Sequence, residues 1–367
     1  MKNGVDKKER LWSLDALRGF DMLFIMGLAT WVVELCKMFP SSGVMQWLAS
    51  QMSHVQWNGL THHDTIFPLF LFVAGVSFPF SIAKQRAAGK SEKQLFIKII
   101  IRGVVLVMLG LVYNGFFKLD FANLRCASVL ARIGLAWMFS ALLFMKLKNK
   151  ILIPIAAVFL VVYWLLLWLI PGGPDTYSYD NNLVGIVDRV LLPGRINHFD
   201  PEGLLSTLPA IVTAMLGMFT GQFVRLSNEK ISGNKKTLYM IIAAVALLCV
   251  GLLWSLVFPV NKKLWSSSFV CVVGAYSLFL FALFYFFIDV KGYRRWTFFF
   301  RVVGMNSITI YLAQSIIGFR QISRFFLGGL VSKFPELWAN LINATGYILI
   351  CWLFLYFLYK KNIFLKV

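Results

Sequence analysis

The chain has 367 residues, of which 59% are hydrophobic and only 14% are charged, and its mean hydropathy is +0.73. This composition excludes an ordinary soluble globular protein and predicts an integral membrane protein. The net charge of +20 could also suit a nucleic-acid-binding protein. However, the basic residues fall in short segments between apolar runs, without interleaved aromatic residues that could stack on bases. We therefore expect a lipid bilayer, and no nucleic acid, as a partner.

Ten apolar runs have about the 20 residues needed to cross a hydrocarbon core of about 30 Å. The expected spans are 12–37, 64–83, 95–116, 127–145, 151–171, 203–224, 237–258, 267–288, 297–316 and 338–359. No polar stretch is long enough for a second domain. Residues 1–367 are thus predicted to form one all-α polytopic membrane domain.

The segment 322–334 is apolar but too short to cross the bilayer, so it is predicted to be interfacial or re-entrant. Lysine and arginine are enriched in cytoplasmic loops. With the N-terminus inside, the ten-span layout places 23 of the 36 Lys and Arg residues inside and ten outside. Both termini are therefore expected to be cytoplasmic, in a multi-pass protein of the inner (plasma) membrane.

Three of the four histidines lie in one stretch, HVQWNGLTHHD, which covers residues 54–64 just before the second span. The fourth, His198, belongs to the loop 172–202. All four fall on the predicted outer side. No HxxxH or HExxH spacing is present, so we expect no metal site. Histidine is instead the side chain best suited to act as a base near neutral pH.

Charged residues inside the spans are the second candidate group, because a charge at membrane depth is costly unless it is paired or hydrated. Arg18 follows Asp15 by three residues and can pair with it on one helical face. Arg132 and Arg301 lie within later spans, and Arg102 lies near the inner end of the third. A structural ion pair or snorkelling to the interface would explain each of them, but guanidinium groups also bind phosphates well.

The segments RLWSLDALRGFDM and HVQWNGLTHHDTIFPLFLFVAGVS resemble the transmembrane heparan-α-glucosaminide N-acetyltransferase family. The bacterial branch of this family is also described as N-acetylglucosamine-related transporters. The family pattern of a His, two variable residues, Trp-Asn-Gly-Leu-Thr and a later Asp matches His54, the stretch 57–61 and Asp64. The segments 200–211 and 304–314 are similar to family segments in the same order.

The resemblance implies an acetyltransferase that uses cytoplasmic acetyl-CoA to acetylate a glucosamine amine across the membrane, with His54 as the active-site histidine. Two departures stand out. Lysosomal members carry a luminal domain and a further span before the core, whereas this chain begins directly at the core. The family's active-site asparagine near the outer end of the first core span falls on Ala29 or its neighbours.

The chemistry suggests roles for the remaining candidates. Asp64 would hold the imidazole tautomer of His54, and Asn58 would donate to the developing oxyanion. His54 would either take the amine proton directly or accept the acetyl group first. The residues expected to bind the sugar are Trp57, Thr61, His198, Asp200 and Glu202. For Asp200, capping of a helix that begins at Pro201 is an equal alternative. The residues expected to bind the CoA phosphates are Arg18, Arg102, Arg132 and Arg301.

An amino-sugar transporter of the inner membrane is the competing function. It would also need about ten spans and charges within them, although the two halves of the sequence contain no clear repeat. A non-catalytic scaffold would leave the clustered histidines without a purpose. The acceptor, the roles of His62 and His63, and the oligomeric state, a homodimer included, stay open.

Overall fold

The computed structural model describes residues 11–170, 175–196 and 199–365, and within these ranges it is helical without extended strands. The first eight helical segments are α1 (Trp12–Leu23), η1 (Phe24–Leu28), α2 (Ala29–Lys37), α3 (Gly43–Ser50), α4 (His62–Ala87), α5 (Glu92–Tyr113), η2 (Phe116–Lys118) and α6 (Val129–Lys146). The next five are α7 (Asn149–Leu169), α8 (Leu183–Leu191), α9 (Thr207–Val224), α10 (Gly233–Ser255) and α11 (Ser267–Phe284). The last six are η3 (Tyr285–Val290), η4 (Arg295–Thr297), α12 (Phe298–Met305), α13 (Ser307–Ile316), α14 (Phe319–Val331) and α15 (Glu336–Lys360).

The expected polytopic architecture is confirmed. Nine stretches within the described residues are helical, long and apolar enough to cross a membrane, and they coincide with nine of the ten expected spans. The remaining span, 297–316, is divided at Asn306 into the shorter helices α12 and α13. The segment 322–334 falls on α14, whose 13 residues are too few for a crossing. Its interfacial position stays a prediction.

The first span is interrupted as well, although its helical character continues from Trp12 to Lys37. Its middle part, η1, is a π-helix, and Gly27 within it has φ +131°. Few residues other than glycine adopt that conformation. A Cβ at Gly27 would also lie 3.0 Å from the ring of Tyr347 on α15. Glycine therefore lets the helix break where α15 packs closely against it.

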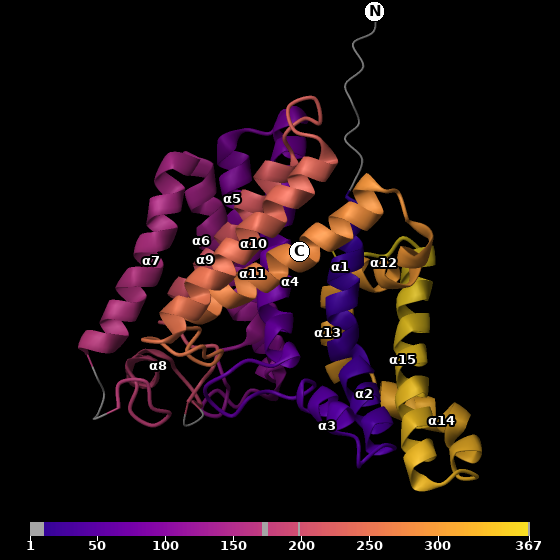
Figure 1. Ribbon diagram of the computed structural model, residues 1–367. Helices are drawn as coiled ribbons and strands as arrows, with labels where there is room; N and C mark the ends of the chain where they lie inside the picture. Colours follow the sequence, from indigo (N-terminus) through magenta and orange to yellow (C-terminus); the bar gives the residue numbers. More distant parts are fainter. Residues whose placement is uncertain (1–10, 171–174, 197–198, 366–367) are drawn as a thin grey trace, which may run out of the picture.

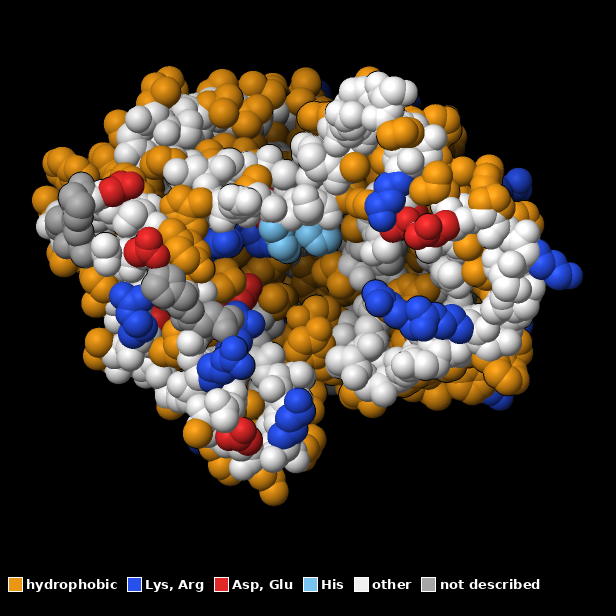
Figure 2. All heavy atoms as spheres, turned by 90° about the horizontal axis from the view of Figure 1, so that it is seen from below, with side chains coloured by type: hydrophobic (Ala, Val, Ile, Leu, Met, Phe, Trp, Pro, Cys, Tyr) orange, Lys and Arg blue, Asp and Glu red, His pale blue; other side chains and the backbone are white. Residues whose placement is uncertain are grey.

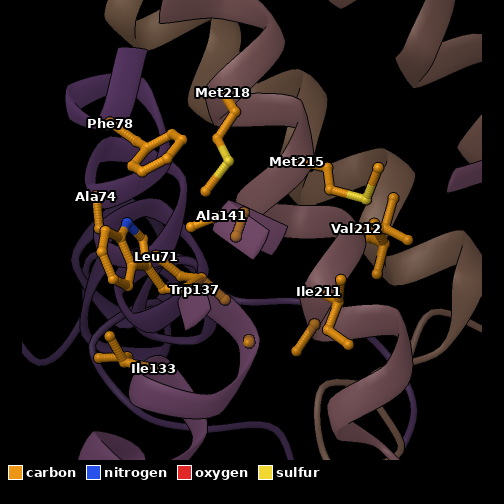
Figure 3. Close-up of a cluster of buried hydrophobic side chains, with 14 of the residues drawn as sticks. Leu71, Ala74, Phe78, Ile133, Trp137, Ala141, Ile211, Val212, Met215 and Met218 are labelled. Carbon is orange, nitrogen blue, oxygen red and sulfur yellow. The ribbon is translucent and has the colours of Figure 1, made fainter. Parts of the chain in front are cut away.

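The long helices form two groups, with α1 between them (Figure 1). One group contains α4 to α7 and α9 to α11, and the other contains α2 and α12 to α15. Helix α1 contacts α4 and α11 on one side and α12 on the other. Figure 3 shows the core of the first group, where Leu71 and Phe78 of α4, Trp137 of α6 and Met218 of α9 belong to one cluster of buried hydrophobic side chains.

The two ends of the helical bundle differ. Helix α1 begins and α15 ends at the upper end in Figure 1, whereas α3, α8 and α14 lie at the lower end. The first residues of α4 also lie at the lower end, so the histidine stretch 54–64 is far from the start of α1 and the end of α15. The placement of both termini on the cytoplasmic side stays a prediction.

Close packing of α1 on α12 generates a first prediction. A Cβ at Gly19 would lie 1.7 Å from the carbonyl oxygen of Phe300. Gly19→Ala should therefore force the helices apart and lower the stability by about 1–3 kcal/mol, as overpacking does. The measurement is thermal unfolding of the purified protein in detergent. Gly328→Ala is the matched control, since no atom lies within 4 Å of its added Cβ. Equal melting temperatures for both variants would contradict this account.

Candidate active site

The site is built around the start of α4. Thr61 is the residue before the helix, and Asp64 is the third residue inside it. The Asp64 carboxylate accepts the backbone N–H of Thr61 at 3.2 Å and its hydroxyl at 2.9 Å. A carboxylate at this position satisfies free N–H groups and interacts favourably with the helix dipole. Local capping chemistry therefore places a fully buried carboxylate, 1% exposed, at the entrance of the bundle.

His54 is held by the same carboxylate. Its Nδ1 lies 2.7 Å from Asp64 Oδ1, and the backbone N–H of Val55 donates to Oδ2 at 3.3 Å. The His54 side chain is 53% exposed, although its partner is buried. With Nδ1–H donated to an ionised carboxylate, the lone pair of the imidazole is on Nε2. The structure thus brings together two of the three predicted catalytic residues.

Lys262 completes this cluster from the loop between α10 and α11. Its Nζ lies 3.4 Å from Asp64 Oδ1 and 3.1 Å from His54 Nδ1. Burial lowers the pKa of Lys262, while the negative charge of Asp64 opposes that shift. The Lys262 ammonium therefore compensates the charge of the buried Asp64 carboxylate directly beside the imidazole ring.

Asn58, the third predicted catalytic residue, is fixed by a second asparagine. Its Oδ1 accepts from Asn261 Nδ2 at 3.0 Å, and Asn261 Oδ1 in turn accepts the backbone N–H of Leu264. The adjacent Gly59 N–H donates to the carbonyl of Val260 at 2.8 Å. With its oxygen used in this way, the exposed Asn58 side chain keeps its NH₂ group as a donor.

Trp57 connects loops rather than facing open solvent. Its indole N–H donates to the carbonyl of Tyr177 at 2.8 Å, and its ring packs edge-on against Tyr179 and Phe199. Thr61 is likewise engaged, because its hydroxyl contacts both the Ser53 carbonyl and Asp64. Both residues support the loop that carries His54, and their role in binding sugar stays a prediction.

His62 and His63 lie beside the cluster. The His63 ring is centred 4.5 Å from that of His54, and the His62 ring is 4.4 Å from Phe24 in the broken part of the first span. The Nδ1 atoms of both rings are buried without a hydrogen-bond partner. Seen from the lower end, the histidines border a hollow with hydrophobic side chains inside and basic side chains next to them (Figure 2).

Asp200 and Glu202 are bound by an arginine that sequence reasoning missed. Arg125 donates from Nε and Nη2 to the two oxygens of Asp200, each at 2.6 Å, and its Nη2 also contacts Glu202. These carboxylates raise the pKa of Arg125. Asp200 is 1% exposed, and its Oδ1 also accepts the backbone N–H of Glu202. Both acids thus already have a cationic partner.

The four candidate arginines are not in one place. Arg132, in the first turn of α6, is buried at the end of the bundle that carries His54. It donates to the carbonyl of Gly203 and to the hydroxyl of Ser206, and its guanidinium lies 5.0 Å from the Trp265 ring. The structure therefore places Arg132 far from the end at which α1 begins and α15 ends.

The other three arginines lie nearer that end. Arg18 donates to the Ser77 hydroxyl at 3.0 Å and lies 3.9 Å from Asp15. Arg102 stacks over Trp137 at 4.2 Å, in a cavity of about 420 Å³ between α4, α5 and α6 that Lys98 also lines. Its Nε has no hydrogen-bond partner.

Arg301 lies over the Trp12 ring, with its guanidinium 3.5 Å from the ring centre, and its Nε has no hydrogen-bond partner either. His198 lies outside the described residues. Among the residues that are described, no group of three or more His, Cys, Asp or Glu side chains could hold a metal ion.

The residues that sequence reasoning missed, Lys262, Asn261 and Arg125, lie far along the chain from their partners. One signal was available for Lys262. It belongs to a Lys-Lys pair in a short segment that the sequence predicts to be on the outer side, where the positive-inside tendency disfavours lysine.

Comparison with known proteins finds no matching family model. Two curated proteins are similar over most of the chain. The heparan-alpha-glucosaminide N-acetyltransferase of Homo sapiens is 26% identical over 98% of the chain and 60% of that protein. The protein of the same name from Mus musculus is 27% identical over 86% of the chain and 56% of that protein. The chain thus spans somewhat more than half the length of these relatives.

Asp188 lies near Asp200, and its raised pKa leads to a prediction about the pH dependence of stability. Burial raises its pKa to about 6, although its carboxylate accepts the Leu204 N–H at 2.7 Å. The folded state therefore binds this proton more tightly than the unfolded chain, whose value is about 3.9. The bound proton adds up to about 3 kcal/mol to the free energy of unfolding. This contribution is complete below about pH 4 and is lost as the pH rises through 6.

Asp188→Asn keeps an acceptor for Leu204 but does not titrate, so the variant should gain stability relative to the wild type as the pH rises from 4.5 to 7.5. Thermal unfolding in detergent across that range measures the difference. The exposed Asp175→Asn is the control. A constant difference between wild type and Asp188→Asn over the whole range would contradict the raised pKa.

Proposed function

We propose that the chain, which is similar over most of its length to two heparan-alpha-glucosaminide N-acetyltransferases, is an acetyl-CoA-dependent N-acetyltransferase of the same family. It transfers acetyl from cytoplasmic acetyl-CoA to the amine of a glucosamine-type sugar on the outer side of the membrane. The observation that carries this proposal is the His54 imidazole, held by a buried carboxylate and beside a lysine at one end of a helical bundle.

The His54–Asp64 pair supplies the base that amide formation needs. The amine nitrogen attacks the thioester carbonyl carbon, the C–S bond breaks, and the amine must lose a proton. His54 Nε2, free of the carboxylate and on an exposed side chain, accepts that proton and returns it to the departing thiolate. Asp64 keeps the other ring nitrogen protonated and stabilises the imidazolium that forms.

The same geometry supports a two-step route. His54 Nε2 attacks the thioester, the thiolate leaves, and the amine then takes the acetyl group from the imidazole. In both routes the carbonyl oxygen gains negative charge in the transition state. The Asn58 NH₂ group, whose oxygen partner is already bound to Asn261, is the candidate donor to that oxygen.

The acyl donor would enter from the opposite end of the bundle. Arg102 and Lys98 line a cavity there, and Arg102 Nε lacks a partner, so a phosphate would satisfy it. Arg18 and Arg301 provide further positive charge near that end. Along α4, Asp64 and Ile82 of this cavity are 18 residues apart, or about 27 Å at 1.5 Å per residue. A long donor such as acetyl-CoA, with its phosphates at one end and its thioester at the other, fits such a separation.

Transport of an amino sugar is the second candidate, and one observation favours it. Both the first span and the segment 297–316 are interrupted, at Gly27 and at Asn306, and α1 packs on α12. Discontinuous helices often form the binding sites of transporters. Uptake of amino sugar should therefore be measured together with acetyl transfer.

Acetyl transfer from radiolabelled acetyl-CoA to glucosamine by the purified protein tests the proposal. We expect transfer by the wild type, none with His54→Ala, and a loss of about 10²–10⁴-fold with Asp64→Asn, which no longer favours the productive tautomer. Thermal unfolding of each variant shows whether the fold is kept. If no amino sugar is acetylated but proteoliposomes without acetyl-CoA take up amino sugar saturably, the transporter is correct instead.

Lys262→Gln provides a separate prediction. Without the ammonium group, the buried Asp64 carboxylate loses one of its donors and holds the His54 ring less firmly, so kcat/KM should fall in the same assay. Lys263→Gln is the matched control, because Lys263 Nζ bonds to the Gln56 carbonyl and not to Asp64. An unchanged kcat/KM for Lys262→Gln would mean that the lysine does not help to position His54.

A further inference from the structure

A second polar cavity lies in the other half of the molecule, and the proposed acetyl transfer does not use it. Its volume is about 340 Å³, and it is enclosed by the broken first span, α14 and α15. Helices α2 and α14, which contribute to it, lie at the lower end of the bundle (Figure 1). The charged and amide side chains that line it are Glu34, Gln314, Arg320, Arg324, Asn340 and Asn343.

The two arginines face the cavity without an acidic partner. Arg320 and Arg324 are four residues apart on α14 and therefore share one face of the helix. Neither forms an ion pair with any residue in the described part of the chain. Arg320 lies 5.8 Å over the Tyr347 ring, which helps to orient it. Two neighbouring guanidinium groups without carboxylates suit a phosphate group.

Two other polar atoms of the cavity lining, one on α2 and one on α14, lack partners as well. Lys37 binds Glu34 Oε1 at 2.7 Å, but the other oxygen of Glu34 is buried without a hydrogen bond. The Ser323 hydroxyl, on a residue that is 2% exposed, also has none. Unpaired buried polar atoms are unfavourable and are usually satisfied by a ligand or by water. A carboxylate oxygen in this state suits an ammonium group.

The surroundings of the cavity indicate that its ligand is a lipid. Phe325 and Phe326, next to Arg324 on α14, are 84% and 68% exposed. Phenylalanine side chains beside arginine on a short helix at the end of a membrane bundle are typical of a helix that lies in the bilayer surface. On the right of Figure 2, over the half that holds α2 and α14, basic side chains surround acidic ones.

We propose that this cavity binds the headgroup of an amine-bearing phospholipid of the outer leaflet, such as phosphatidylethanolamine. Arg320 and Arg324 contact the phosphate, Glu34 contacts the ammonium group, and α14 lies in the headgroup layer with its phenylalanines among the acyl chains. The site is independent of the proposed acetyl transfer, although the broken first span forms a wall of the cavity and also contacts His62 through Phe24.

Native mass spectrometry of the full chain, delipidated in detergent and titrated with phosphatidylethanolamine or phosphatidylglycerol, tests this proposal. The wild type should prefer phosphatidylethanolamine. The double variant Arg320→Gln/Arg324→Gln should bind both lipids at least about tenfold more weakly, since each lost charge-assisted contact costs roughly that factor. Glu34→Gln should keep the affinity for phosphatidylglycerol and lose the preference for the amine.

Three further measurements make the outcome decisive. Lys333→Gln removes a positive charge just beyond α14 and outside the cavity, and it should bind lipid as the wild type does. His54→Ala should also bind normally, so failure of acetyl transfer and failure of lipid binding can be told apart. Equally tight binding of free phosphorylethanolamine would assign the site to a soluble phosphate ester instead. Lipid binding that is unchanged in the double variant, or equally weakened by Lys333→Gln, would overturn the proposal.

Discussion

One buried carboxylate, that of Asp64, organises the end of the molecule at which the histidines lie. It caps α4 through Thr61, orients the His54 ring and lies 3.4 Å from the Lys262 ammonium. A carboxylate that is 1% exposed is stable only when several donors surround it. The donors that satisfy this charge come from two loops, the one before α4 that carries His54 and the one before α11 that carries Lys262. Both loops therefore meet at Asp64.

This constraint connects the helix packing to the chemistry. The Lys262 loop is also bound to the His54 loop by the Asn58–Asn261 and Gly59–Val260 hydrogen bonds. Its position depends on α10 and α11, which pack together and flank it. The loop that carries His54, the proposed base, is thus held between the start of α4 and the loop before α11. A fixed position suits a group that must contact both an acyl donor and an amine in one orientation.

The broken first span occupies a central position between two different environments. On one side Phe24 packs on His62, and on the other Gly27 contacts Tyr347 and lines the polar cavity beside α14. A π-helical segment with a glycine at φ +131° interrupts the regular helix at this place. Such segments are frequent at functional sites. The proposed acetyl transfer and the proposed lipid site therefore border the same irregular segment of backbone.

The sequence by itself determined the polytopic helical class and most of the spans, and it suggested the contact between His54 and Asp64 that the structure contains. Apolar runs of about 20 residues admit few alternatives in a bilayer, and a histidine ten residues before a helix-capping aspartate is a local relation. Tertiary structure alone decided which distant groups meet these residues. Lys262 lies 198 positions beyond Asp64, and Arg125 lies 75 before Asp200. Tertiary structure also divided 297–316 into two helices and placed Arg132 and Arg102 apart. The partner of a buried charge depends on which helices pack together, and hydrophobic periodicity does not specify that packing.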